Sequence, residues 1–125
     1  MEETRSEARE IAMKILYQVS IMEKAKSSYD LDEMFMEVKG RNKNFVKELV
    51  NEVILKKEQL DKKANEYLIN WEIGRLNMVD QAIFEIAIYE RLYTETPNKV
   101  AIDEAINLAK KYSDDAVVRM LNGVL

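Results

Sequence analysis

The segment MVDQAIFEIAIYERLY, residues 78–93, constrains the fold most, because it is apolar on almost every side of a helix. Its apolar side chains cover nearly every direction around the axis, with only Glu85 between them: Ala82, Ile83, Phe84, Ile86, Ala87 and Ile88. A helix that is apolar nearly all round is packed on several sides. The sequence therefore predicts that this helix is central and that the other elements surround it.

The segments before it are amphipathic and predict the first helices of the surrounding set. A first helix is expected from about Thr4 to Ile21, because its apolar residues recur at helical spacing. Asp30 is suited to cap a second helix, which Gly40 would end. A third helix would follow a cap at Asn42 or Asn44, with Phe45, Leu49 and Val53 on its buried face.

Breaks in the second half of the chain predict four more helices, the central one included. The third helix is expected to end or bend around Lys56–Glu58 into a fourth, and NWEIGRLN (70–77) is expected to form a tight connection. Pro97 would lie near the start of the sixth helix. Ser113 would cap the last, with Asp114 and Asp115 in its first turn.

Composition supports an all-α protein in a single domain, residues 1–125. Apolar residues make up 47% of the chain and charged residues 34%, and three Gly and one Pro leave few breaks. We predict a compact bundle of about seven short helices in two packed halves. The first three helices form one half and the remaining four the other, with the central helix near the join.

The residue types that are missing exclude most catalytic and metal chemistry. The chain has no Cys and no His, which removes thiolates, the commonest general base and the commonest metal ligand. No metal, cofactor or enzymatic activity is expected. No apolar run is long enough to span a bilayer, so we expect a soluble, cytoplasmic protein. The net charge of −4 argues mildly against tight, non-specific binding to nucleic acid.

Four separated stretches together resemble the NusB family of transcription antitermination factors. They are AREIAMKILYQ (8–18), FVKELVNEVILKKEQLDKKANEYLINW (45–71) with RLNMVDQAIFEIAIYERLY (75–93), PNKVAIDEAINLAKKYS (97–113), and the terminal LNGVL (121–125). The resemblance implies a NusB-like, all-helical RNA-binding protein that pairs with the ribosomal protein NusE. The pair would recognise boxA RNA and help RNA polymerase read through terminators, above all in ribosomal RNA transcription. The family also allows a homodimer.

Arg5 and Arg9 are the first candidate RNA-binding residues. At about 100° per residue they fall about 40° apart on the first helix, while Glu3, Glu7 and Glu10 occupy another sector. One phosphate could therefore meet both guanidinium groups. The resemblance places a denser arginine cluster here, of which this chain keeps these two positions. An ordinary solvated helix start remains the alternative.

The resemblance adds candidates near the end of the chain and on the partner-facing surface. Lys111, Tyr112, Arg119 and Met120 would contact RNA, although Met120 stands where the family commonly has an aromatic residue, and Tyr112 and Met120 could instead be half-buried core residues. Tyr17 and Asp80 match positions linked to partner binding and, for Asp80, to the surface that meets NusE. Tyr17 could equally flank the core, and Asp80 could be a carboxylate favoured by the helix dipole.

Three classes of function therefore compete. The first is an RNA-binding antitermination factor that works with NusE. The second is a protein–protein adaptor of the same fold that has reduced or lost direct RNA binding. An enzyme is the third, and nothing in the residue pattern favours it, since no carboxylate is spaced with a nucleophile or metal ligand.

Overall fold

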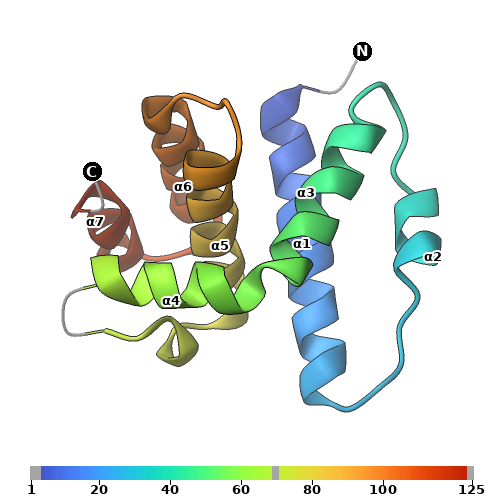
Figure 1. Cartoon of the computed structure of the whole chain (residues 1–125), viewed down its shortest axis with the longest axis horizontal. Coiled ribbons are helices and arrows are strands. Elements are labelled where there is room, and N and C mark those ends of the chain that lie inside the picture. Colours follow the sequence, from blue (N-terminus) through green and yellow to red (C-terminus); the bar gives the residue numbers. More distant parts are fainter. Residues whose placement is uncertain (1–3, 69–70, 124–125) are drawn as a thin grey trace.

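The computed structural model describes residues 4–68 and 71–123, and this part of the chain forms seven α-helices and one short 3-10 helix (Figure 1). The elements are α1 (Arg5–Lys24), α2 (Leu31–Met36), α3 (Lys43–Leu55), α4 (Lys57–Tyr67), η1 (Ile73–Arg75), α5 (Met78–Tyr93), α6 (Asn98–Tyr112) and α7 (Asp115–Gly123). The all-α prediction is confirmed. None of the described helices combines the length and the apolar character needed to cross a bilayer. Glu3, the start of the predicted connection at 70 and the end of LNGVL at 124–125 lie outside the described residues.

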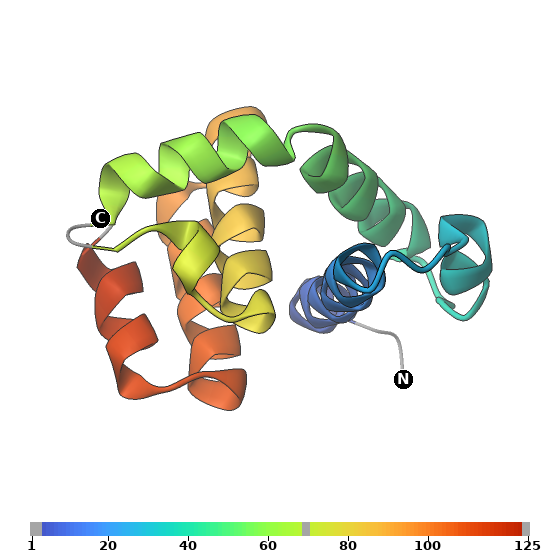
Figure 2. The same cartoon turned by 90° about the horizontal axis from the view of Figure 1, so that it is seen from below.

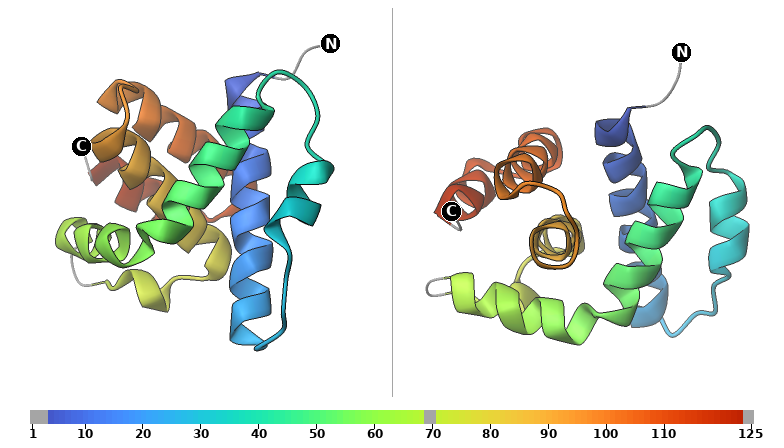
Figure 3. Two further views of the ribbon diagram at one scale, coloured as in Figure 1. Left: turned by 45° about the vertical axis from the view of Figure 1, so that its right-hand side comes forward. Right: turned by 45° about the horizontal axis from the view of Figure 1, so that its top comes forward.

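The helices gather into two groups, α1–α3 and α4–α7, as Figures 1 and 2 show from two directions. Helix α5 lies at the join, where it packs against α1 and α3 of one group and against α4 and α6 of the other. The right-hand view of Figure 3 looks nearly along α5 and shows both groups around it. Every residue from Ala82 to Glu90 is buried. The predictions of two halves and of a central helix are therefore confirmed.

Helix α1 has a well-defined start. The Thr4 hydroxyl accepts the N–H of Glu7, and the Glu7 carboxylate accepts the N–H of Thr4, so two donors of the first turn are satisfied. The helix then buries one apolar stripe: Ala8, Ala12, Met13, Ile15, Leu16 and Val19. Because Glu7 is used in this cap, its charge stays at the tip of the helix.

The second helix is shorter than the sequence predicted. Asp30 caps α2 as expected, but the helix ends at Met36 and not at Gly40. Val38 is buried although it lies beyond the end of the helix. Its N–H donates to the carbonyl of Phe35 at 3.0 Å and closes a turn there. Gly40 has a φ of +98°, a left-handed conformation that costs glycine little, and it directs the chain toward α3.

The connections in the second half agree with the sequence except at the last helix. Only Lys56 separates α3 from α4, as the predicted bend required, and Pro97 directly precedes α6. The prediction that Ser113 caps α7 is wrong, because Asp114 holds that position and its Oδ1 accepts the N–H of Val117 at 3.1 Å. Ser113 follows the last residue of α6 as its C-cap, and its hydroxyl donates to the carboxylate of Asp80 on α5.

Candidate nucleic-acid interface

Arg9 of α1 is buried and holds Glu90 of α5 in a two-pronged ion pair. Its Nε donates to Oε1 at 2.7 Å and its Nη2 donates to Oε2 at 2.8 Å. Arg9 is 6% exposed and Glu90 is 2% exposed. The carboxylate of Glu104 on α6 lies farther away, 3.9 Å from Nη1. The pair therefore ties the N-terminal end of α1 to the other group of helices.

The surroundings keep Arg9 charged. Burial by itself lowers the pKa of Arg9, but the hydrogen bonds and charge of Glu90, with a further contribution from Glu104, raise the pKa above its ordinary value. The hydroxyl of Thr96 also donates to Glu90 Oε2 at 3.2 Å. A buried ion pair tolerates the loss of water only when its geometry is good and its remaining lone pairs are satisfied. Both conditions are met here.

Arg5 lies one turn earlier on α1 and is exposed. Its Nε donates to Oδ1 of Asn42 at 3.1 Å, and its guanidinium carbon lies 4.2 Å from the centre of the Phe45 ring. The guanidinium carbon of Arg9 lies 5.4 Å from the same ring. A cation over an aromatic face is attracted by the quadrupole of the ring. Phe45 of α3 therefore holds Arg5 in place while leaving it accessible from solvent.

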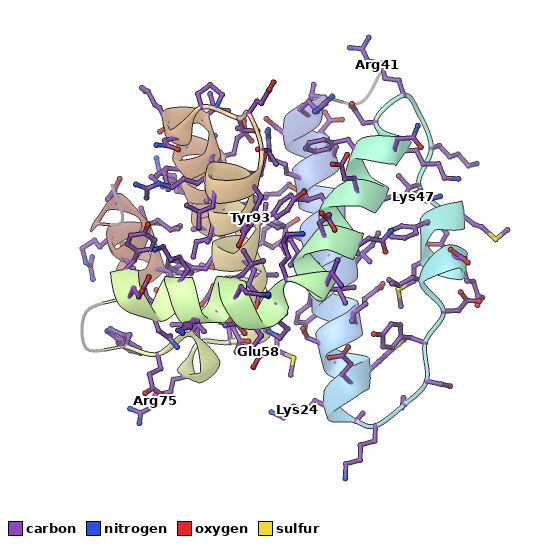
Figure 4. The ribbon with its side chains drawn as sticks, in the orientation of Figure 1. Lys24, Arg41, Lys47, Glu58, Arg75 and Tyr93 are labelled. Carbon is purple, nitrogen blue, oxygen red and sulfur yellow. The ribbon has the colours of Figure 1, made fainter. Side chains whose placement is uncertain are left out.

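The prediction that Arg5 and Arg9 offer two free guanidinium groups on one flank is wrong for Arg9. The two residues do start from the same side of α1, whereas Glu7 is used in the helix cap and Glu10 pairs with Lys111. The carboxylate that neutralises Arg9 comes from α5, 81 positions along the chain. A phosphate that approaches this end of α1 therefore meets Arg5 first. Figure 4 labels Arg41 on the loop at the same end of the molecule, just before α3.

The last turn of α6 faces the middle of α1. The Nζ of Lys111 donates to both carboxylate oxygens of Glu10, at 2.8 and 3.1 Å, and the Nζ of Lys14 lies 3.5 Å from the same carboxylate. The hydrogen bond from Lys111 is the main reason why the pKa of Glu10 is lowered. Tyr112 is 36% exposed, and its ring centre lies 5.5 Å from Nζ of Lys111 and 5.8 Å from Nζ of Lys14. An RNA base can stack on an exposed aromatic ring, and the ammonium groups beside the ring can contact the phosphate of that nucleotide.

These two groups of candidates do not form one continuous patch. Arg5 and Glu10 are five positions apart, which places them about 140° apart around α1. Arg5 therefore faces α3, whereas Glu10 carries Lys111 and Tyr112 on the side that faces α6. Helix α7 packs against α6 and carries Arg119, whose side chain is exposed. Met120 is half-buried and packs against the core.

The two partner candidates differ in accessibility. Tyr17 is 37% exposed on α1 and is available to a partner. Asp80 is 5% exposed in the first turn of α5, where its N–H donates to Oδ1 of Asn77 at 2.8 Å and its carboxylate accepts the hydroxyl of Ser113. Burial raises the pKa of Asp80, and the Ser113 hydrogen bond opposes that rise. Asp80 therefore holds the corner between α6 and α7 against α5.

Three residues of this region were not recognised from the sequence as part of it. Phe45 was assigned to the buried face of the third helix, yet it also supports the Arg5 guanidinium. Asn42 was expected to cap that helix, but its side chain makes no cap hydrogen bond and accepts from Arg5 instead. Glu90 was not among the predicted site residues, although a carboxylate in a helix that is apolar nearly all round indicates a buried cationic partner.

The arrangement of helices defines an all-helical protein with the fold of NusB structures. Thermotoga maritima NusB is similar over 99% of this chain and 89% of that chain, with a TM-score of 0.84 and 26% sequence identity. A chain in the crystal structure of the antitermination factors NusB and NusE in complex with dsRNA has a TM-score of 0.78 over 96% of this chain and 91% of its own. Its identity to this chain is 22%, so that likeness concerns the fold alone.

The sequence itself belongs to the NusB family, whose family pattern matches residues 6–125. The transcription antitermination protein NusB of Macrococcus caseolyticus strain JCSC5402 is 41% identical over 122 residues, which cover 98% of this chain and 93% of that protein. The protein of the same description from Bacillus subtilis strain 168 is 36% identical over 125 residues, 97% of this chain and 91% of its own. The resemblance stated from the sequence is therefore confirmed, and the chain is a NusB-type transcription antitermination factor.

Proposed function

We propose that this protein pairs with the ribosomal protein NusE and binds boxA RNA, and that the complex assists RNA polymerase in transcribing ribosomal RNA. Family membership across residues 6–125 is the observation that carries this proposal. A protein of this fold has also been crystallised with NusE and dsRNA. As part of the transcription apparatus, the protein would work in the cytoplasm.

The positions of the side chains indicate which residues would contact RNA, which would contact NusE and which would support the structure. Arg5 is exposed and held over Phe45, so it would meet a phosphate on the α3 side of α1. Lys111, Tyr112 and Arg119 would meet RNA on the side of α6 and α7. Arg9 would act indirectly, since its pair with Glu90 fixes the turn of α1 from which Arg5 projects. Tyr17 would contact NusE, and Asp80 would hold the shape of the adjoining corner.

A second function is a protein–protein adaptor with weakened RNA binding. Two cationic groups proposed for RNA already have carboxylate partners, Arg9 with Glu90 and Lys111 with Glu10. Each phosphate contact that is lost lowers the salt dependence of RNA binding by about one unit. Such a protein would still bind NusE.

Titration of fluorescent boxA RNA at two salt concentrations, with and without NusE, separates the two functions. We expect salt-sensitive binding that strengthens when NusE is added, and weaker binding to an RNA of scrambled sequence. Normal NusE binding with no RNA binding at either salt concentration would support the adaptor. Failure to bind NusE as well would overturn both proposals. Sedimentation of the isolated protein in the same buffers tests whether it forms a homodimer without its partner.

A further inference from the structure

A pocket of about 230 Å³ opens beside Arg5, where α1 and α3 meet the end of α5. Arg5, Phe45 and Glu48 line it on one side, and Tyr89, Thr94 and Glu95 line it on the other. The sequence candidates for RNA binding include only Arg5 of this set. Arg5 begins α1 and Phe45 lies in the first turn of α3, and the loop just before α3 carries Arg41, which is labelled in Figure 4.

The aromatic side of the pocket is already assembled. The guanidinium carbon of Arg5 lies 4.2 Å from the centre of the Phe45 ring, and the hydrogen bond from Arg5 Nε to Asn42 limits the rotation of the guanidinium. The opposite face of a guanidinium plane is a surface on which an unstacked RNA base can lie. A base in the pocket would then contact the side of Arg5 that Phe45 does not cover.

The loop side of the pocket is also held in place. The Thr94 hydroxyl donates to the backbone carbonyl of Glu90 at 2.6 Å, and the N–H of Thr96 donates to the Thr94 hydroxyl oxygen at 3.2 Å. The carboxylate of Glu90 is occupied by Arg9 and Thr96. Because Glu90 is occupied, Glu48 and Glu95 are the carboxylates that can receive a ligand in this pocket, and both are exposed.

The chemistry of these two carboxylates selects one kind of base. An ionised carboxylate only accepts hydrogen bonds, and it can accept two side by side. On its Watson–Crick edge, guanine offers two adjacent donors, the N1–H and the exocyclic amino group. Adenine and cytosine place an acceptor beside their amino group, and uracil has a single donor between two acceptors. The carboxylates also repel phosphate, so the neutral base would enter the pocket while the phosphate of the RNA stays outside it, on the solvent side of Arg5.

We propose that this pocket receives a single unstacked guanine of the bound RNA. The base stacks on the outer face of the Arg5 guanidinium, and its Watson–Crick edge donates to Glu48 or Glu95. This inference rests on the proposed RNA binding and assigns a base-reading role to one part of it. A matched bidentate pair discriminates against the wrong base by about tenfold or more.

The test uses the complex with NusE and single-stranded RNA of twelve nucleotides that is uridine-rich and contains one guanosine. The same strand is prepared with inosine, which lacks the amino group, and with adenosine at that position. We expect binding about tenfold weaker for adenosine and intermediate binding for inosine. Equal affinity for all three strands would overturn the guanine pocket.

Variants of the pocket carboxylates test whether the preference for guanosine arises in this pocket. Glu48→Gln and Glu95→Gln each retain the size of the side chain but lose the paired acceptors, so we expect at least one of them to remove the preference for guanosine. Glu58→Gln is the matched control, since Glu58 is exposed on α4 and is not among the residues that line the pocket. A guanosine preference that survives both pocket variants would also overturn the assignment.

A direct readout comes from adding guanosine monophosphate or adenosine monophosphate to the ¹⁵N-labelled protein. We expect the amide signals of Thr94 and Thr96 to shift with the guanine nucleotide and to shift less with the adenine nucleotide. Binding of boxA RNA with no guanosine preference would overturn the proposal of a guanine pocket but would agree with the proposed function. If the complex with NusE bound no RNA at all, boxA RNA included, the proposed function itself would be overturned.

Discussion

The guanidinium of Arg9 and the carboxylate of Glu90 form the ion pair that joins the two groups of helices, although 81 positions separate them in the chain. Phe45 covers the pair from α3, and Thr96 adds a hydrogen bond from the loop that leads to α6. Helices α1, α3 and α5 and the loop before α6 therefore meet at one buried charge pair. We expect the ion pair to have a structural role. It also positions Arg5, because Arg5 and Arg9 lie one turn apart on α1.

Removing one member of this pair should destabilise the protein strongly. Arg9→Met or Glu90→Leu leaves an uncompensated buried charge, and we expect each to cost about 3–5 kcal/mol in the free energy of unfolding. The double variant should cost clearly less than the sum, because neither charge then remains. Urea unfolding of the three variants measures this coupling. Additive effects would show that the two groups do not interact in solution.

Arg5 should affect RNA binding and not the fold. Arg5→Ala removes one exposed cation, so we expect weaker binding to boxA RNA and a salt dependence reduced by about one unit. The cation–π contact with Phe45 is worth about 0.5–1 kcal/mol at an exposed site, so stability should change little. Arg75→Ala is the control, since Arg75 is exposed on η1 at the opposite corner of the molecule (Figure 4). Equal RNA affinity for Arg5→Ala and the control would exclude Arg5 from the site.

Glu10 should restrain RNA binding through Lys111. Glu10→Gln removes the carboxylate that accepts both hydrogen bonds of the Lys111 ammonium, so this charge becomes available beside Tyr112. We expect tighter binding to boxA RNA and a steeper salt dependence, by up to about one unit. Glu66→Gln removes a comparable surface carboxylate, which pairs with Lys63 on α4, and should leave RNA binding nearly unchanged. If both variants bind RNA equally, Lys111 does not contact it.

A buried acidic group between α4 and α5 should make stability depend on pH. Glu85 lies 2.6 Å from Nζ of Lys57, which also pairs with Asp61 at 3.0 Å. Oδ1 of Asp61 is buried without a hydrogen-bond partner among the described residues. Burial and the neighbouring Asp61 carboxylate raise the pKa of Glu85 to about 8, and Lys57 offsets only part of that rise. The folded protein therefore holds a proton on Glu85 that the unfolded chain releases.

The direction of the pH effect follows from this raised pKa. The ordinary value is 4.5, so the folded state binds more protons than the unfolded state between that value and about 8. The stabilisation is fully present below pH 4.5 and is lost as the pH rises toward 8. Glu85→Gln cannot lose a proton and should remove this part of the dependence. Urea unfolding at several pH values in this interval compares the two proteins, and parallel curves would show that Glu85 titrates at its ordinary pKa.

Local patterns in the chain predicted the elements and much of their arrangement. The apolar residues around the 78–93 segment predicted a central helix, and α5 is buried continuously from Ala82 to Glu90. Asp30 and Pro97 marked helix starts that the structure contains. The helices and their starts could be predicted from the sequence because helix periodicity and capping depend on neighbours three or four positions away. The candidate site was predicted less completely, since its charges depend on contacts between helices.

The sequence by itself determined a helical NusB-type chain with Arg5 and Arg9 on one side of the first helix. Only the tertiary structure decided that Arg9 is neutralised by Glu90, that Lys111 binds Glu10, and that Arg5 rests on Phe45. Periodicity tells which residues share a face, but it cannot tell which side chain of a distant helix will cover that face. That pairing is set when the two groups of helices pack around α5, and it distinguishes the buried, structural Arg9 from the exposed Arg5.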